Sequence, residues 1–387
     1  HSYTPGLKVL KKTIFKKERI LPLKGDVLVK SGDQLTPDTI VASTNLPGNV
    51  QMLKVSNILN IDPKDVVEAL QVKEGQEVKK GDIIAETSGI FGMFKSSVES
   101  PVDGTIESIS QSTGRVVVRE APIPVEVDAY VSGVVDEVVE NEGIVLKSNA
   151  AFIQGIFGIA GEKRGDLLLV SSGPGEELTA DQITADMKGK ILIGGSFLSL
   201  DAYKKALSVQ VAGIVVGGFN YYDLKAILGY NLGVAITGTE KLNTALIVTE
   251  GYGSIPMSEA TFSLLKENDG KAASINGATQ IRAGVIRPEI VIPIDAGNTD
   301  DDSSSKMPEG IQEGSIVRVI RSPNFGKIGK VISLPAELNK MESETMVRVA
   351  EINIDGKNIL IPRANLEMVE TAVSYTHLRA HETDSYL

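Results

Sequence analysis

The side chains that most often carry acid–base, nucleophilic or transition-metal chemistry are nearly missing from this chain. The sequence contains no cysteine, and its three histidines are His1, His377 and His381. A Ser-His-Asp triad, a Cys-His pair and a zinc site of Cys or His ligands all need such residues in the body of the fold. We therefore predict no catalytic residue, no transition-metal site and no cofactor, which favours a binding protein over an enzyme. Magnesium or calcium held by oxygen ligands stays open, because Asp and Glu are plentiful.

Two of these histidines lie in a C-terminal segment that differs from the rest of the chain. Residues 373–387 read VSYTHLRAHETDSYL, and no periodic pattern of apolar residues continues into them. The stretch resembles the conceptual translation of a sequencing adapter. We accordingly expect residues 371–387 to lie outside the folded domains.

Length and charge restrict the classes of protein that remain. A chain of 387 residues predicts about two or three domains. Its formal net charge of −11 argues against a protein that coats duplex DNA, although one domain could still carry a basic face. No apolar run reaches the ~18–20 residues that span a bilayer, so we expect no membrane segment. The lack of cysteine fits a reducing compartment, and we expect a cytoplasmic protein.

The N-terminal region, residues 1–165, has short Val, Ile and Leu runs separated by Gly, Pro, Asp and Asn, which is typical of β-strands. Gly-Asp and Gly-Gln recur in VKSGD (29–33) and VKEGQEVKKGD (72–82), and predict tight turns in which glycine adopts a positive φ. One short helix is expected after Asp62, which can cap it. Together, VKEGQEVKKGDIIAET and SPVDGTIESIS resemble the biotinyl/lipoyl-type barrel-sandwich hybrid, which implies that fold for this region.

The resemblance also suggests one modification site. In carrier proteins of this type a lysine at a hairpin tip receives the cofactor, and Lys95 is the lysine of the corresponding segment, residues 86–97. This segment is longer than the hairpin of a carrier, and Lys95 lacks the Met-Lys-Met or Asp-Lys-Ala surround. We therefore favour the alternative, in which the barrel-sandwich serves as a structural platform.

From residue 166 to 294, strand-like runs alternate with helical ones, which predicts βα units and a mainly parallel sheet. Helices are expected over residues 199–209, 222–228 and 258–268. Ligands of parallel sheets bind beyond the carboxyl ends of the strands, where glycine lets the backbone approach a phosphate. Gly217 and Gly218 are candidates for such an anion site, although tight βα turns also use glycine and are the simpler explanation. Arg282 and Arg287 could clamp an anion or form interdomain salt bridges.

The acidic stretch at residues 295–310 has no apolar periodicity and predicts a linker. Beyond it, residues 311–370 again read as strands. Within them, RSPNFGKIGKVI (321–332) resembles the KOW motif of small SH3-like barrels, with Gly329 matching the motif's glycine in a tight turn. That family occurs in transcription elongation factors and ribosomal proteins, where it contacts RNA, polymerase or other proteins. The candidates for contact with nucleic acid or a partner are Arg318, Arg321, Phe325, Lys327 and Lys330.

These candidates allow more than one function. The basic residues could bind phosphates, and Phe325 could stack on a base or act as an apolar anchor for a protein. A solvated barrel face with charges of both signs is the plainer alternative. As a whole the chain resembles bacterial proteins with a C-terminal KOW motif, and the leading hypothesis is a non-catalytic binding or assembly factor of transcription or translation. An accessory or carrier component of an enzyme complex, and an enzyme whose α/β domain binds a phosphorylated ligand, remain the alternatives.

Overall fold

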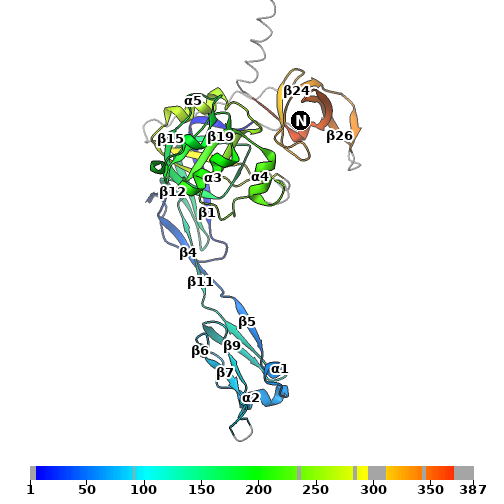
Figure 1. Cartoon of the computed structure of the whole chain (residues 1–387). Coiled ribbons are helices and arrows are strands. Elements are labelled where there is room, and N and C mark those ends of the chain that lie inside the picture. Colours follow the sequence, from blue (N-terminus) through cyan, green and yellow to red (C-terminus); the bar gives the residue numbers. More distant parts are fainter. Residues whose placement is uncertain are drawn as a thin grey trace, which may run out of the picture.

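The computed structural model of the chain describes residues 6–89, 92–232, 237–281, 286–294, 311–341 and 346–369. Strands dominate over helices. The molecule is elongated, and a stalk of strands joins a lobe at one end to a broad end that holds an α/β sheet and the C-terminal strands (Figure 1). The linker predicted at residues 295–310 and the tail at 371–387 lie outside the described residues.

The lobe at the far end of the stalk, residues 47–122, is a β unit with its own core, and we call it the distal lobe. Its strands are β5 (Val50–Lys54), β6 (Glu77–Val78), β7 (Ile83–Glu86), β8 (Ser97–Glu99), β9 (Gly104–Ser110) and β10 (Arg115–Arg119). The order β5-β10-β9-β6 forms one sheet, and β7 pairs with β8 in another. The short helices are α1 (Val55–Leu59) and α2 (Val66–Ala69), with the 3-10 turn η1 (Pro63–Asp65) between them. Alternation along β10 turns Val116 and Val118 inward, where both are fully buried.

The repeated glycine turns share one geometry and confirm the prediction from sequence. They are Lys30–Asp33, Lys73–Gln76 and Lys79–Asp82, and their glycines have φ of 88°, 84° and 89°. In each turn the last residue donates its backbone N–H to the carbonyl of the lysine, and its side chain accepts the N–H of that lysine, at 2.9–3.1 Å. Glycine suits the third position because a residue with a Cβ is disfavoured at positive φ.

The stalk consists of antiparallel strands that lead from the distal lobe into the broad end. These strands are β1 (Val9–Ile20), β2 (Asp26–Val27), β3 (Gln34–Leu35), β4 (Ile40–Leu46), β11 (Ile123–Asp128), β12 (Gly133–Val139) and β13 (Gly143–Gln154). β4 pairs with β2 and β11, and β13 pairs with β1 and β12. Tyr130 is fully buried in their core, where the charged groups of Lys17 and Arg19 lie 5.5 and 5.2 Å from its ring centre.

The α/β unit is built on a mixed sheet that continues from the stalk. Its further strands are β14 (Phe157–Ile159), β15 (Glu162–Leu169), β16 (Glu177–Leu178), β17 (Ile191–Ile193), β18 (Phe197–Leu198), β19 (Gly213–Phe219), β20 (Ala245–Tyr252), β21 (Ala272–Asn276) and β22 (Glu289–Pro293). The order is β14-β20-β19-β17-β15-β21-β22-β13-β12-β3. Parallel pairing joins β15, β17, β19 and β20, as predicted, and antiparallel strands flank them on both sides.

The domain boundary predicted between residues 165 and 166 is wrong. It falls inside β15, and β13 of the N-terminal region joins the same sheet through β22. Residues 1–165 are therefore not one separate barrel-sandwich. The distal lobe stands apart, whereas the stalk strands share hydrogen bonds with the α/β unit. Apolar alternation identifies a strand but does not say which sheet it joins, because its pairing partners lie far away in the sequence.

Helices cover both faces of the parallel strands. α3 (Leu200–Val209) and α4 (Tyr221–Leu228) pack on one face, and α5 (Glu259–Glu267) packs on the other. Successive residues of β19 point to opposite faces, so Ile214 and Val216 join the α3 side and Val215 the α5 side. This double burial explains the continuous apolar run of β19. In the part of the chain that the structure describes, none of the helices has the length and apolar character needed to cross a bilayer.

The last part of the chain, residues 311–369, forms a separate set of strands that we call the C-terminal unit. They are β23 (Ile316–Val319), β24 (Ile328–Ser333), β25 (Leu338–Lys340), β26 (Met346–Ile354), β27 (Lys357–Pro362) and β28 (Leu366–Met368). The order is β25-β26-β24-β23-β28, and β27 pairs with β26. Gly329 lies inside β24 and not in a tight turn, which corrects the prediction. Its lack of a side chain still matters, because a Cβ there would lie 2.5 Å from the carbonyl oxygen of Asn353.

Candidate functional site

The C-terminal unit is joined to the α/β unit by a seam that is packed like a protein core. The ring of Phe325 lies 6.1 Å from that of Phe157 and 6.2 Å from that of Tyr252, measured between ring centres. The two backbones also meet, since a Cβ on Gly251 would lie 2.3 Å from the carbonyl oxygen of Gly326. Close packing of this kind holds the two units in one arrangement.

This seam overturns the role predicted for Phe325. The side chain is only 7% exposed, so its ring is not available to stack on a base or to anchor an external protein. The sequence correctly places Phe325 in a loop, which connects β23 to β24. The loop faces the α/β unit, and the apolar ring is therefore used inside the chain.

A buried ion network crosses the same seam. Arg318 is 3% exposed, and it donates from Nη1 to Glu367 at 2.7 Å and from Nη2 to the carboxylate of Glu250 at 3.1 Å. Its Nε donates to the backbone carbonyl of Glu250 at 2.6 Å. The second oxygen of Glu367 pairs with Arg287. Two guanidinium groups and two carboxylates neutralise one another, which makes the burial of these charges tolerable.

The network shows which of the predicted roles two arginines have in the structure. The surface role predicted for Arg318 is wrong, because Glu250 and Glu367 hold its guanidinium inside the seam. For Arg287 the interdomain salt bridge is confirmed. Burial lowers the pKa of Arg287, while Glu367 acts against this shift and the charge of Arg318 adds to it. Arg282, the other half of the proposed anion clamp, lies outside the described residues.

The glycines at the end of β19 serve chain packing and not anion binding. A Cβ on Gly217 would lie 2.0 Å from the carbonyl oxygen of Ile255, and one on Gly218 would lie 1.8 Å from that of Gly253. The N–H of Gly217 already donates to Gly195 at 2.8 Å. The backbone of this strand end is thus covered by the chain itself, which corrects the phosphate-site prediction.

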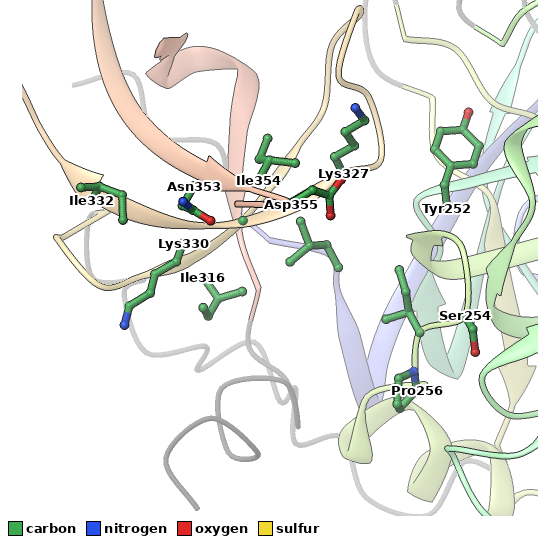
Figure 2. Close-up of a pocket in the computed structure, with 13 residues that line it drawn as sticks. Tyr252, Ser254, Pro256, Ile316, Lys327, Lys330, Ile332, Asn353, Ile354 and Asp355 are labelled. Carbon is green, nitrogen blue, oxygen red and sulfur yellow. The ribbon is translucent and has the colours of Figure 1, made fainter. Parts of the chain in front are cut away.

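The seam opens at its edge into a cleft between the C-terminal unit and the α/β unit. Its volume is about 620 Å³. Figure 2 shows Tyr252, Ser254 and Pro256 on one wall and residues of β24 and β26 on the other. The lining residues from the C-terminal unit are Ile316, Lys327, Ile328, Gly329, Lys330, Ile332, Asn353, Ile354 and Asp355. The predicted contact residues Lys327 and Lys330 therefore both line this cleft, and both are exposed.

An apolar stripe that sequence reasoning missed runs through this cleft. Ile328, Lys330 and Ile332 lie on the outer face of β24, because they alternate with the buried Gly329 and Val331. Ile332 is 43% exposed. The signal was present in the sequence as isoleucines on the same strand face as Lys330.

The other predicted residues lie elsewhere. Arg321 is half-buried outside the cleft, and its Nη1 donates to the carbonyl of Ile320 at 3.3 Å. Lys95 is exposed in the distal lobe, between β7 and β8. Cofactor attachment at Lys95 stays a prediction.

Comparisons with known proteins add no family to this description. No model of a protein family matches the chain, and a search of curated proteins finds no match. Within the described ranges, no three His, Asp or Glu side chains form a group that could hold a metal ion. The cleft is thus the best-defined candidate site.

Buried tyrosines lead to a prediction about alkaline pH. Burial raises the pKa of Tyr203 and of Tyr252 well above the ordinary value of 10.0. A group with a raised folded-state pKa stabilises the fold below its unfolded pKa, and this stability is lost as the pH rises beyond that value. We expect the free energy of unfolding to fall above pH ~10, by about 1.4 kcal/mol per pH unit for each such tyrosine.

Urea unfolding at several pH values between 9 and 12 measures this slope. Tyr203→Phe removes one titrating group and should make the slope shallower, whereas Tyr222→Phe, at a residue 75% exposed, should leave it unchanged. Equal slopes for Tyr203→Phe and the unmodified chain would contradict the assignment.

Proposed function

We propose that this chain is a non-catalytic binding protein that docks a protein partner in the cleft between the C-terminal unit and the α/β unit. In this proposal the C-terminal unit is an SH3-like barrel of the KOW type, and the distal lobe is a barrel-sandwich hybrid of the biotinyl/lipoyl type that serves as a platform. The resemblance of the motif suggests a partner from the transcription or translation machinery.

The cleft is the observation that supports a protein partner over RNA. Its outer stripe combines Ile328 and Ile332 with Lys330. Exposed aliphatic side chains beside a cation suit a segment with aliphatic and acidic side chains, because apolar burial and charge pairing then act together. RNA recognition would draw on stacking aromatics and several basic groups, yet Phe325 and Arg318 are both buried.

Binding of defined peptides tests this proposal. The unmodified chain is titrated with fluorescent synthetic peptides that pair Ile, Leu or Val with Asp or Glu, and with matched peptides that carry Lys in place of the acids. We expect the acidic peptides to bind, and Ile332→Asp or Lys330→Glu to weaken binding at least about tenfold, as a contact at the centre of an interface does.

Lys54→Glu is the matched control, because Lys54 is exposed on β5 in the distal lobe and does not line the cleft. It should leave peptide affinity unchanged. Single-stranded RNA is titrated in parallel at low and high salt. Tight, salt-sensitive RNA binding that depends on Lys330, together with no peptide binding, would replace the protein partner with a nucleic acid.

A further inference from the structure

The strands β1, β13 and β12 present one open sheet face in the part of the stalk next to the α/β unit (Figure 1). Along β1, Phe15, Lys17 and Arg19 point into the stalk core, so the residues between them point outward. The pairing register places the outward residues of the three strands on one surface, which we call the stalk face. Its rows across β1, β13 and β12 are Ile14 and Asn149; Lys16, Lys147 and Val134; Glu18, Val145 and Glu137; and Ile20, Gly143 and Val139.

The stalk face is partly apolar and stands in solvent. Ile14 is 43% exposed and Ile20 is 37% exposed, at its two ends. The same side of β13 continues into Ala151 and Ile153, which are buried in the core that contains α5, so this cover ends before the four rows begin. An exposed face with several aliphatic side chains marks an interaction surface more often than single exposed residues do.

Charges on the stalk face are separated along the strands. Lys16 and Lys147 lie next to each other in one row and share the carboxylate of Asp136, at 3.2 and 3.6 Å. Glu18 and Glu137 lie in the next row, and neither forms a salt bridge with a described residue. One half of the face is therefore basic and the other half acidic.

The charged residues around the face keep this separation. The acidic half is flanked by Glu140 and Glu142 in the turn after β12, and Lys12 lies beyond the basic half. The remaining charges nearby have an opposite charge beside them or lie toward β4, namely Lys11 with Glu267, Lys30 with Asp33, and Lys24, whose carbonyl accepts from Thr44. The stalk face thus has a basic and an acidic end.

This pattern selects the occupant. A nucleic acid or an anionic membrane would be repelled by the acidic half of the face. A second copy of the chain matches both halves. A two-fold axis that reverses the strand direction places the glutamate row of one copy over the lysine row of the other, and does so twice. The same rotation brings Ile20 of one copy to Ile14 of the other, so that apolar side chains close both ends.

We propose that the stalk face is a homodimer interface, through which two copies of this chain pack their sheets face to face with the strands antiparallel. With strands ~4.8 Å apart and a rise of ~3.4 Å per residue, the face measures roughly 15 by 24 Å. A dimer of this size is weak, and salt dissociates it because its charges stand in solvent. This inference goes beyond the proposed function and does not depend on it, because the stalk face shares no residue with the cleft.

Sedimentation equilibrium of the full chain over a range of concentrations provides the first test. We expect a dimer whose dissociation constant rises at least about tenfold between low and high salt. Lys16→Glu sets a carboxylate against Glu18 of the other copy, and Glu18→Lys sets a cation against Lys16. Each single change should weaken the dimer at least about tenfold. Glu68→Lys is the matched control, because Glu68 is exposed on α2 in the distal lobe, and it should leave the dimer unchanged.

Mixing the two weakened variants separates a charge effect from a folding defect. One chain then presents two carboxylates and the other two cations, so the mixture should form a heterodimer at least as tight as the unmodified dimer. The double variant Lys16→Glu/Glu18→Lys should also dimerise. A chain that stays monomeric up to about 100 μM, a dimer indifferent to both changes, or no recovery on mixing would overturn the proposal. Binding of single-stranded RNA or anionic vesicles that depends on Lys16, without a dimer, would overturn it too.

Discussion

Glu367→Gln is expected to destabilise the chain by about 3–5 kcal/mol, because it removes the charge that holds two buried guanidinium groups in the seam. Glu367 is fully buried, and its two oxygens accept separately from Arg318 and Arg287. Glutamine keeps the shape of the side chain but can neutralise neither arginine. Glu250 still pairs with Arg318, so one of the two cations in the dry seam is left uncompensated, and this costs far more than a lost surface ion pair.

Chemical denaturation of the full chain measures this loss, with Glu313→Gln as the control. Glu313 is exposed in the same unit, so its replacement should change stability by less than about 0.5 kcal/mol. Because buried pairs are screened little by salt, the effect of Glu367→Gln should persist at 1 M salt. A loss below ~1 kcal/mol, or one that disappears with salt, would show that water reaches the network.

Phe325→Ala is expected to have a comparable effect, a loss of about 3–5 kcal/mol, since it leaves a cavity in the aromatic part of the seam. Phe325 packs against Phe157 and Tyr252 from the other unit. The cavity cannot close easily, because the backbones at Gly251 and Gly326 are already in contact. Phe94→Ala is the matched control at a residue 90% exposed, and it should change stability by no more than about 0.5 kcal/mol.

Hydrogen exchange shows where this stability is lost. In Phe325→Ala the amides of β20 and β23 near the seam should exchange faster, whereas those of β9 and β10 in the distal lobe should keep their protection. Peptide binding at the cleft should weaken as well, because its two walls belong to different units. If Phe325→Ala left both stability and exchange unchanged, the seam would not hold the two units together.

The well-packed seam makes the broad end of the molecule one structural part, and the stalk connects this part to the distal lobe (Figure 1). The C-terminal unit and the α/β unit form one broad end whose cleft depends on both of them. The stalk strands continue from the α/β sheet to the distal lobe through hydrogen-bonded pairs.

Local patterns in the sequence were sufficient to predict many of the individual helices and turns. The helix predicted at residues 199–209 begins after Ser199, whose side chain accepts the N–H of Ala202 at 3.1 Å. α5 begins after Ser258 in the same way, with Thr261 as the donor. Caps, glycine turns and apolar periodicity act over a few residues, so the sequence alone determines them. The shortage of histidine and cysteine also needs no structure to exclude the chemistries that depend on them.

Only the tertiary structure decided which of the predicted residues face solvent. The sequence predicts that Arg318 and Phe325 contact an external partner, yet Glu250 and Phe157 from another unit bury them. The tertiary structure likewise decided the sheet membership of the stalk strands. They join the α/β sheet across the domain boundary predicted between residues 165 and 166. Burial, sheet membership and clefts arise from contacts between segments far apart in the chain. The local pattern of one strand cannot specify them, because the same alternation fits a solvent face and an interface equally well.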